Sequence, residues 1–234
     1  MTTPYFLFAV NPTKNVSDTA ENQIITLNQK TVHILPYVNV DYYMKRGLFE
    51  SNIIDWCKQL CRKDKIMLDI GAHSGTYALS LADYSSAVYA FEPQKATYYS
   101  LCGGVCLSGK QNITCYQTGL GSSDQCGIKD LNIVSHDGGG STLHPKSPVL
   151  RIESIEIRTL DSYNIDNIGF IKMDVEENEL YVLQGGVETL IRSNFPKVLF
   201  ESNYENKSLF DFLRNLGYKI IPIQGYRNMY LAEH

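Results

Sequence analysis

The feature that most restricts the fold is an alternation of short apolar runs with stretches of helical periodicity in the middle of the chain. The runs at 66–70, 87–91 and 113–117 have the length of strands, and polar or glycine residues follow each of them. Between them, 76–84 and 95–107 carry apolar residues at helical spacing. Such alternation is typical of a mostly parallel sheet with helices on both faces. We therefore predict an α/β protein with a Rossmann-like fold.

The alternation returns in the last third of the chain. The elements expected there are strand 169–173, helix 179–192, strand 197–201 and helix 207–216. Two final strands, at 218–222 and 228–231, are separated by a tight turn that contains Gly225. So short a link permits only an antiparallel pair, because parallel strands need a crossover connection. The prediction is a seven-stranded, mostly parallel sheet that ends in an antiparallel hairpin.

A long segment interrupts the alternation between the third and fourth strands. Residues 120–166 are too many for a simple loop. Within them, 127–134 and 150–158 alternate in polarity around a glycine-rich stretch at 137–142. We expect a β-hairpin-like insertion with a flexible tip.

The N-terminal residues 1–47 are less regular and are expected to cap the edge of the sheet. An amphipathic helix is expected to follow at 49–62. A chain of 234 residues that is 44% hydrophobic can bury one sizeable core. We therefore expect a single domain over 1–234.

The composition excludes several partners. A formal net charge of −4 gives no basic field for a phosphate backbone, so no nucleic-acid partner is expected. No apolar run is long enough to predict a membrane span. The six cysteines lack the spacing of zinc ligands and are expected to be free thiols, which suits a reducing cytoplasm.

The loop after the first strand indicates the kind of cofactor. Ligands of an open parallel sheet bind outside the carboxyl ends of its strands. Here residues 71–75 read Gly-x-x-x-Gly, where dinucleotide-binding proteins have Gly-x-Gly-x-x-Gly. This loop leaves room for a methionine chain and lacks a phosphate cradle, which favours S-adenosylmethionine. Asp69, near the end of the strand, is placed to orient the loop and the cofactor's ammonium group.

The next two strands end in residues that suit the same cofactor. Glu92 follows Asp69 by 23 residues (92 − 69), where an acidic residue accepts hydrogen bonds from both ribose hydroxyls. Gly119 and Leu120 are placed to face adenine. An ordinary strand-end turn would explain each of these three signals alone. Their occurrence at the ends of three successive strands favours a cofactor site. The predicted cofactor contacts are Asp69, Gly71, Ala72, His73, Ser74, Gly75, Thr76, Glu92, Pro93, Gln94, Gly119, Leu120 and Asp174.

A series of short motifs runs from about residue 47 to residue 201. They are Gly-Leu-Phe-Glu at 47–50, Leu-Asp-Ile-Gly-Ala at 68–72 with Gly75, Phe-Glu-Pro at 91–93, Arg-Thr-Leu-Asp at 158–161, Ile-Lys-Met-Asp-Val-Glu at 171–176, Glu-Leu at 179–180, Val-Leu-Gln-Gly-Gly at 182–186 and Phe-Glu at 200–201. The Lys-x-Asp-x-Glu segment, followed by Glu-Leu and Leu-x-Gly, is the specific part. In these motifs the chain resembles the FkbM family of S-adenosylmethionine-dependent O-methyltransferases.

The resemblance implies a class I methyltransferase fold and methyl transfer to a hydroxyl, often of a sugar or polyketide-like acceptor, with S-adenosylhomocysteine as the product. We accordingly expect a hydroxylated small molecule or a glycan as the acceptor. The sequence departs from the family at two places. Glu177 stands where the family has glycine, and Cys-Gly-Gly-Val-Cys at 102–106 replaces an asparagine-rich helix end.

Four residues are candidates for the chemistry. An acceptor hydroxyl is a weak nucleophile, so a base must remove its proton as the new bond forms. Asp174, Glu176 and Glu201 lie at the ends of the fourth and fifth strands, and His144 lies in the insertion. Structural roles are open for three of them: Glu176 as a helix cap, Glu201 as a partner of Lys172, and His144 as a solvated loop residue.

A divalent metal is the alternative to a carboxylate base. Close carboxylates repel one another, so either one is protonated or a cation such as Mg²⁺ neutralises them. Catechol-type metal-dependent methyltransferases have an Asp-Asn pair after the fifth strand, but here Ser202 and Asn203 follow Glu201. We therefore predict no metal site and a carboxylate base, foremost Asp174.

Three rival functions differ in what they require. A nicotinamide-dependent oxidoreductase needs the phosphate-binding glycine motif that is missing here. A cap-ribose methyltransferase uses a Lys-Asp-Lys-Glu set, to which Asp174 and Glu201 fit, but the helix expected after the fourth strand has no lysine. A non-catalytic interaction protein with this fold has no need to keep Asp69 and Glu92.

Overall fold

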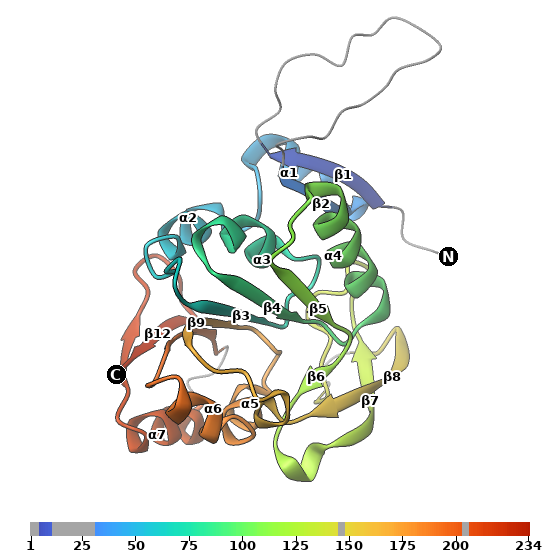
Figure 1. Ribbon diagram of the computed structural model, residues 1–234. Helices are drawn as coiled ribbons and strands as arrows, with labels where there is room; N and C mark the ends of the chain where they lie inside the picture. Colours follow the sequence, from blue (N-terminus) through green and yellow to red (C-terminus); the bar gives the residue numbers. More distant parts are fainter. Residues whose placement is uncertain (1–4, 11–30, 145–147, 203–205) are drawn as a thin grey trace, which may run out of the picture.

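A seven-stranded sheet forms the centre of the computed structural model, which describes residues 5–10, 31–144, 148–202 and 206–234 (Figure 1). The strands, in sheet order, are β11 (Lys219–Pro222), β12 (Met229–Glu233), β10 (Lys197–Glu201), β9 (Ile168–Met173), β3 (Ile66–Ile70), β4 (Ala87–Phe91) and β5 (Ile113–Tyr116). β12 is antiparallel to both its neighbours, and the other pairs are parallel. The predicted α/β fold and its C-terminal hairpin are confirmed.

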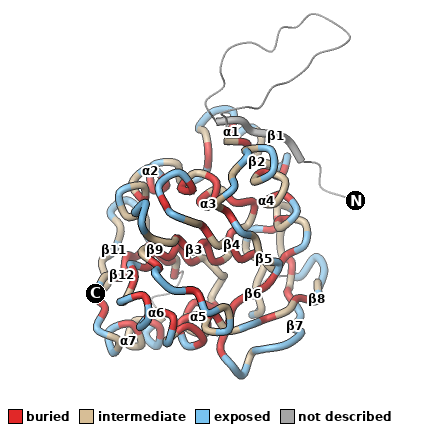
Figure 2. Tube along the Cα trace, in the orientation of Figure 1, coloured by how far each residue is buried: buried red, intermediate tan, exposed pale blue. Residues whose placement is uncertain are grey.

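Helices cover both faces of this sheet (Figure 1). One face carries α2 (Ser51–Cys57), α3 (Thr76–Leu81) and α4 (Lys95–Ser108), and the other carries α5 (Glu179–Gln184), α6 (Val187–Arg192) and α7 (Lys207–Asn215). Successive residues of β3 serve opposite faces, as Met67 joins the core under α3 and Leu68 the core under α5 and α6. Buried residues concentrate on the central strands (Figure 2).

The single helix expected over 179–192 is two helices, and glycine explains the break. Gly185 approaches Gly121 so closely that a Cβ atom would lie 2.1 Å from the Gly121 carbonyl oxygen. The Asp161 carboxylate then accepts the N–H groups of Glu188 and Thr189, at 3.3 and 2.7 Å, and caps the start of α6. The Arg-Thr-Leu-Asp and Leu-Gln-Gly-Gly motifs therefore serve the same turn.

The N-terminal segment is more regular than its sequence suggests. β1 (Tyr5–Val10) and β2 (Thr31–Pro36) form an antiparallel hairpin, followed by the short helices η1 (Tyr37–Asn39) and α1 (Val40–Arg46). β2 packs on α3 and α4, so this cap lies mainly against helices, where a position over the sheet edge was expected. Residues 1–4 and 11–30 of the cap lie outside the described residues. The helix expected over 49–62 ends already at Cys57.

Within β2, the side chain of His33 is completely buried. Neither of its ring nitrogens has a hydrogen-bond partner among the described residues. Burial lowers the pKa of His33 from 6.5 to about 4, so the ring is neutral at neutral pH.

The insertion is the expected hairpin with one added strand. β7 (Gly127–Ile133) and β8 (Arg151–Arg158) pair antiparallel, and β6 (Gly119–Leu120) runs parallel to β8. The short helix η3 (Ser123–Gln125) lies between β6 and β7 in the chain, and η4 (Leu160–Tyr163) follows β8. Leu131, Ile133, Ile155 and Ile157 form a small core of their own. Residues 145–147 lie outside the described residues, and no helix in the described ranges is long and apolar enough to cross a membrane.

Candidate active site

The carboxyl ends of β3 and β9 meet in a contact that only glycine permits. Gly71 has a positive φ of 75°, and a Cβ atom there would lie 1.8 Å from the carbonyl oxygen of Asp174. Two backbone hydrogen bonds to Phe91 and one from Asp174 to Ile70 fix this approach. The sheet thus brings the glycine loop and the Asp-Val-Glu segment together.

Glu92, at the end of β4, is buried and anchored on both carboxylate oxygens. Oε2 accepts the backbone N–H of His73 at 2.8 Å. Oε1 accepts the backbone N–H of Gln94 at 2.9 Å and the hydroxyl of Thr97 at 2.8 Å. Burial raises the pKa of Glu92, and these donors together with His73 counteract that effect. The carboxylate is therefore held in one orientation next to the glycine loop.

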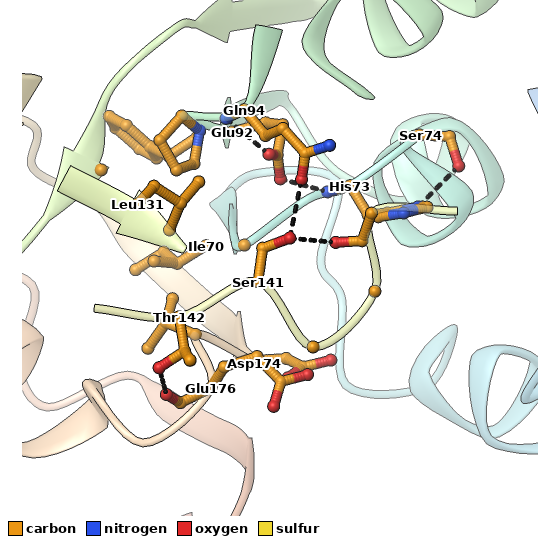
Figure 3. Close-up of a pocket in the computed structure, with 18 of the residues that line it drawn as sticks. Ile70, His73, Ser74, Glu92, Gln94, Leu131, Ser141, Thr142, Asp174 and Glu176 are labelled. Carbon is orange, nitrogen blue, oxygen red and sulfur yellow. Dashed lines mark hydrogen bonds between the residues drawn. The ribbon is translucent and has the colours of Figure 1, made fainter. Parts of the chain in front are cut away.

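A cavity of about 280 Å³ opens between these loops (Figure 3). Its lining includes ten of the thirteen predicted cofactor contacts, namely Gly71, His73, Ser74, Thr76, Glu92, Pro93, Gln94, Gly119, Leu120 and Asp174. Asp69, Ala72 and Gly75 lie outside this lining. Sequence and structure thus converge on one wall of the cavity.

Asp69 lies outside the cavity lining and holds the helix that begins beside it. Its Oδ2 atom accepts the backbone N–H of Ala78 at 2.9 Å in the first turns of α3. Its Oδ1 atom is buried and has no hydrogen-bond partner within the described ranges. Burial raises the pKa of Asp69 to about 6, against the opposing charge of Lys172. Asp69 therefore anchors the helix that follows the glycine loop.

The four catalytic candidates separate into two groups. Asp174 and Glu176 line the cavity, whereas Glu201 and His144 do not. The ring of His144 lies 6.1 Å from that of Tyr181. The structure therefore brings one carboxylate pair to the cavity and leaves a histidine outside it.

Lys172 holds the first carboxylate of this pair. Its Nζ atom lies 3.4 Å from Asp174 Oδ2, 3.4 Å from the Gly71 carbonyl oxygen and 5.0 Å from the centre of the Tyr77 ring. Burial alone would lower the pKa of this lysine, but the carboxylates of Asp174, Asp69 and Glu50 raise it by more. The pKa of Lys172 therefore lies above its ordinary value. Lys172 is therefore charged and pairs with Asp174 and not with Glu201.

Three further carboxyl groups near Asp174 have pKa values raised to about 7, and two of them are catalytic candidates. Burial, followed by the charge of Asp174, raises the pKa of Glu176 to about 7. The same two causes, joined by the charges of Glu176 and Glu50, raise the pKa of Glu201 to about 7. Burial and the charge of Asp174 also raise the pKa of Glu179 to about 7. Of these three groups able to take up a proton at neutral pH, Glu176 alone lines the cavity.

Glu50 lies outside the cavity lining but influences the carboxyl groups near it, and sequence reasoning missed it. It begins α2 with a left-handed φ of 56°, and its Oε2 atom accepts the Tyr77 hydroxyl at 2.7 Å. Its charge contributes to the raised pKa of Glu201. The only signal for it was its place in the Gly-Leu-Phe-Glu motif.

The segment after β9 is strained. Glu176 and Glu177 both have left-handed backbones, with φ of 52° and 77°. Residues other than glycine adopt this region at an energetic cost, and such outliers cluster at functional sites. The strain at Glu177 explains why glycine suits this position in the family that the chain resembles.

Two distant segments complete the cavity. The cap contributes Pro36, Asn39 and Tyr43, and the loop after the cap contributes Phe49. The insertion contributes its tip, residues 137–142, which is tied by hydrogen bonds where the sequence suggested flexibility.

Within the described ranges, no group of three His, Cys, Asp or Glu side chains is arranged to hold a metal ion. Asn203, which follows Glu201 and Ser202 where metal-dependent relatives have an Asp-Asn pair, lies outside those ranges.

Comparisons with known proteins agree with this geometry. Residues 69–220, well over half of the chain, match the methyltransferase FkbM domain. No curated protein sequence matches the chain. Among solved structures, an FkbM methyltransferase from Methylobacillus flagellatus matches with a TM-score of 0.51 at 19% identity, over 74% of this chain and 44% of that one. The chain therefore spans less than half the length of that protein.

Two other solved structures share the fold. A precorrin-6y C5,15-methyltransferase from Geobacter metallireducens matches with a TM-score of 0.51 at 11% identity, over 80% of this chain and 89% of that one. A Streptococcus mutans protein in complex with SAH matches with a TM-score of 0.50 at 13% identity, over 78% of this chain and 94% of that one. Together these matches show the Rossmann-like methyltransferase architecture.

Proposed function

Because the chain belongs to the FkbM methyltransferase family, we propose that it transfers the methyl group of S-adenosylmethionine to a hydroxyl of a sugar or glycan. One observation carries this proposal. A single cavity is lined by a buried strand-end carboxylate, Glu92, and by a carboxylate pair, Asp174 and Glu176, on its other side (Figure 3). The first suits a ribose, and the second suits an acceptor hydroxyl.

The residues around Glu92 fit the cofactor in their chemistry. Glu92 would accept the ribose hydroxyls, the loop at 71–76 would enclose the methionine chain, and Gly119 with Leu120 would face adenine. When bound, S-adenosylmethionine supplies a methyl group on a sulfonium sulfur, which is a good leaving group. The protein's main task is then to hold the acceptor in line, which supplies about 7–11 kcal/mol of the barrier in well-oriented reactions.

Glu176 is the base that we propose. Sequence reasoning favoured Asp174, but the carboxylate of Asp174 is engaged in an ion pair with Lys172 at 3.4 Å. Glu176 lines the same cavity, and its pKa of about 7 is matched to neutral pH. Asp174 then acts as a fixed acceptor that orients the hydroxyl, and Glu176 takes its proton.

The charges around the pair favour an uncharged acceptor. Asp174, Glu176, Glu201 and Glu50 influence one another electrostatically, and the charge of Lys172 is engaged by Asp174. A phosphate-rich acceptor such as RNA would be repelled there, whereas sugar hydroxyls donate hydrogen bonds to carboxylates.

All six cysteines are free, which supports action in the cytoplasm.

Binding and transfer test the proposal separately. Thermal unfolding should shift upwards with S-adenosylhomocysteine, following RT ln(1 + [L]/Kd), and not with NAD. Radiolabelled S-adenosylmethionine should then label a saccharide from a panel of neutral mono- and oligosaccharides, and not RNA, in the presence of EDTA. Labelling of RNA alone would support the cap-ribose alternative. Activity that EDTA abolishes and Mg²⁺ restores would replace the carboxylate base by a metal, and absence of any cofactor binding would support a non-catalytic role.

A further inference from the structure

The tip of the insertion, residues 137–142, lies across the cavity between its two sides (Figure 3). All six residues of this segment, which we call the strap, line the cavity. Thr142 and Asn132 exchange two backbone hydrogen bonds, of 3.0 and 3.1 Å, which fasten the strap to β7. The strap is therefore a fixed element of the cavity wall.

On the cofactor side, the strap is attached to residues around Glu92. The Ser141 hydroxyl donates to Gln94 Oε1 at 2.9 Å, and His73 Nε2 lies 2.8 Å from the carbonyl oxygen of Asp137. Gly138 has a φ of 85°, and a Cβ atom there would lie 2.8 Å from Gln94 Nε2. Gln94 and His73 are also the residues whose backbone N–H groups hold the Glu92 carboxylate.

On the acceptor side, the strap holds Glu176 at two points. The Thr142 hydroxyl donates to the Glu176 carbonyl oxygen at 2.8 Å. The backbone N–H of Gly140 also acts on the Glu176 carboxyl group and lowers its pKa against the effect of burial. Because Glu176 has a left-handed backbone, it keeps this conformation only where its surroundings enforce it.

A third attachment joins the strap to the N-terminal cap. The carboxylate of Asp137 accepts the side-chain N–H of Asn39 at 2.9 Å and the backbone N–H of Gly139 at 3.2 Å. The strap thus links three segments that are distant in the sequence.

We propose that the strap positions Glu176 for proton removal and couples it to the cofactor side, with Thr142 as the positioning residue. This inference rests on the proposed function in taking Glu176 as the base. Thr142 acts through the Glu176 backbone, while Gly140 orients the carboxylate itself. Ser141 connects the same strap to Gln94, so movement at one side of the cavity reaches the other.

Substitutions at two neighbouring strap residues, which contact opposite sides of the cavity, separate its functions. Thr142→Val removes the hydroxyl and keeps the shape, and we expect it to lower kcat about tenfold, as for a lost hydrogen bond, with little change in affinity for S-adenosylhomocysteine. Thr142→Ser keeps the hydroxyl and should restore kcat. Ser141→Ala should instead weaken S-adenosylhomocysteine binding about threefold. Thr114→Val, at an exposed position of β5, is the matched control that should change neither.

A second readout needs no acceptor. The amide proton of Gly140 should follow the ionisation of Glu176 in an NMR pH titration, with a midpoint near 7. This titration should vanish in Glu176→Gln and shift in Thr142→Val. An unchanged Gly140 titration in Thr142→Val would overturn the inference, as would equal effects of Thr142→Val and Thr142→Ser. If the wild-type protein transfers no methyl group, the proposed function fails, while the Gly140 titration still decides whether the strap positions Glu176.

Discussion

The cofactor side and the acceptor side of the cavity are constructed in different ways. The three hydrogen bonds that the Glu92 carboxylate accepts join residues at most 19 positions apart in the chain, in loops that leave adjacent parallel strands. The Glu176 carbonyl oxygen accepts a hydrogen bond from Thr142 of the insertion, 34 positions away, and the strap that carries Thr142 is bonded to the cap through Asn39 and Asp137, which are 98 positions apart. The sheet itself determines the first side, whereas the second depends on packing between separate segments.

Removing the proposed base should have the largest effect and should be confined to the acceptor side. Glu176→Gln keeps the size of the side chain but cannot take a proton, so turnover should fall about 10²–10⁴-fold. Affinity for S-adenosylhomocysteine, measured by calorimetry, should stay close to that of the wild type. Glu177→Gln is the neighbouring control. Full turnover in Glu176→Gln, together with loss of turnover in Asp174→Asn, would return the role of base to Asp174.

Acid should destabilise the cap that supports the acceptor side. His33 has a pKa of about 4 when folded and 6.5 when exposed. The contribution of neutral His33 to the free energy of unfolding is therefore fully present above pH 6.5. It declines as the pH falls towards 4, because only the unfolded chain gains the proton in this range, and the loss is about 3 kcal/mol. His33→Leu should remove this part of the pH dependence in urea unfolding at about pH 7 and about pH 4. The same slope in both proteins would show that another group is responsible.

On the cofactor side, Glu92→Gln should weaken binding of S-adenosylhomocysteine at least about tenfold, because charge-assisted hydrogen bonds become neutral ones. The far-ultraviolet circular dichroism spectrum should remain that of the wild type, since the amide fills the same space. Unchanged affinity, measured by calorimetry, would mean that the ribose does not bind at Glu92 and would remove the distinction between the two sides.

The pH profile of turnover should respond to the acceptor side alone. With Glu176 as base, the rate should rise with pH through about 7 and level off once the carboxylate is ionised. Asp174 raises the pKa of Glu176, so Asp174→Asn should move this rise to lower pH even if it also lowers the rate. Glu92→Gln should leave the midpoint in place. A midpoint that moves in Glu92→Gln would show that the two sides are coupled through charge.

The smallest effect is expected from Glu177→Gly. Glycine relieves a left-handed backbone but gains freedom in the unfolded chain, so we expect stabilisation by at most about 1 kcal/mol. Thermal unfolding measures this gain. Destabilisation would indicate that the Glu177 side chain contributes contacts to the rim of the acceptor side.

The same contrast explains how far the sequence alone could lead. Strand ends, glycine spacing and an acidic residue after β4 are local patterns, so the fold and ten residues of the cavity lining could be predicted from the sequence. The break at Gly185, the pairing of Lys172 with Asp174 and the role of Glu50 arise from contacts across the fold. Periodicity carries no information about such contacts.

The sheet formed by β6, β7 and β8 has a hydrophobic core of its own and carries the strap at the end of its hairpin. Such a unit can be exchanged between relatives while the strands of the central sheet stay in place, provided that the contacts of the strap with His73, Gln94 and Glu176 are kept. A chimera with the insertion of another family member would therefore keep its methyl donor and adopt a new acceptor. Under the proposed function, acceptor specificity could therefore change through one hairpin and its contacts, without any change in the central sheet.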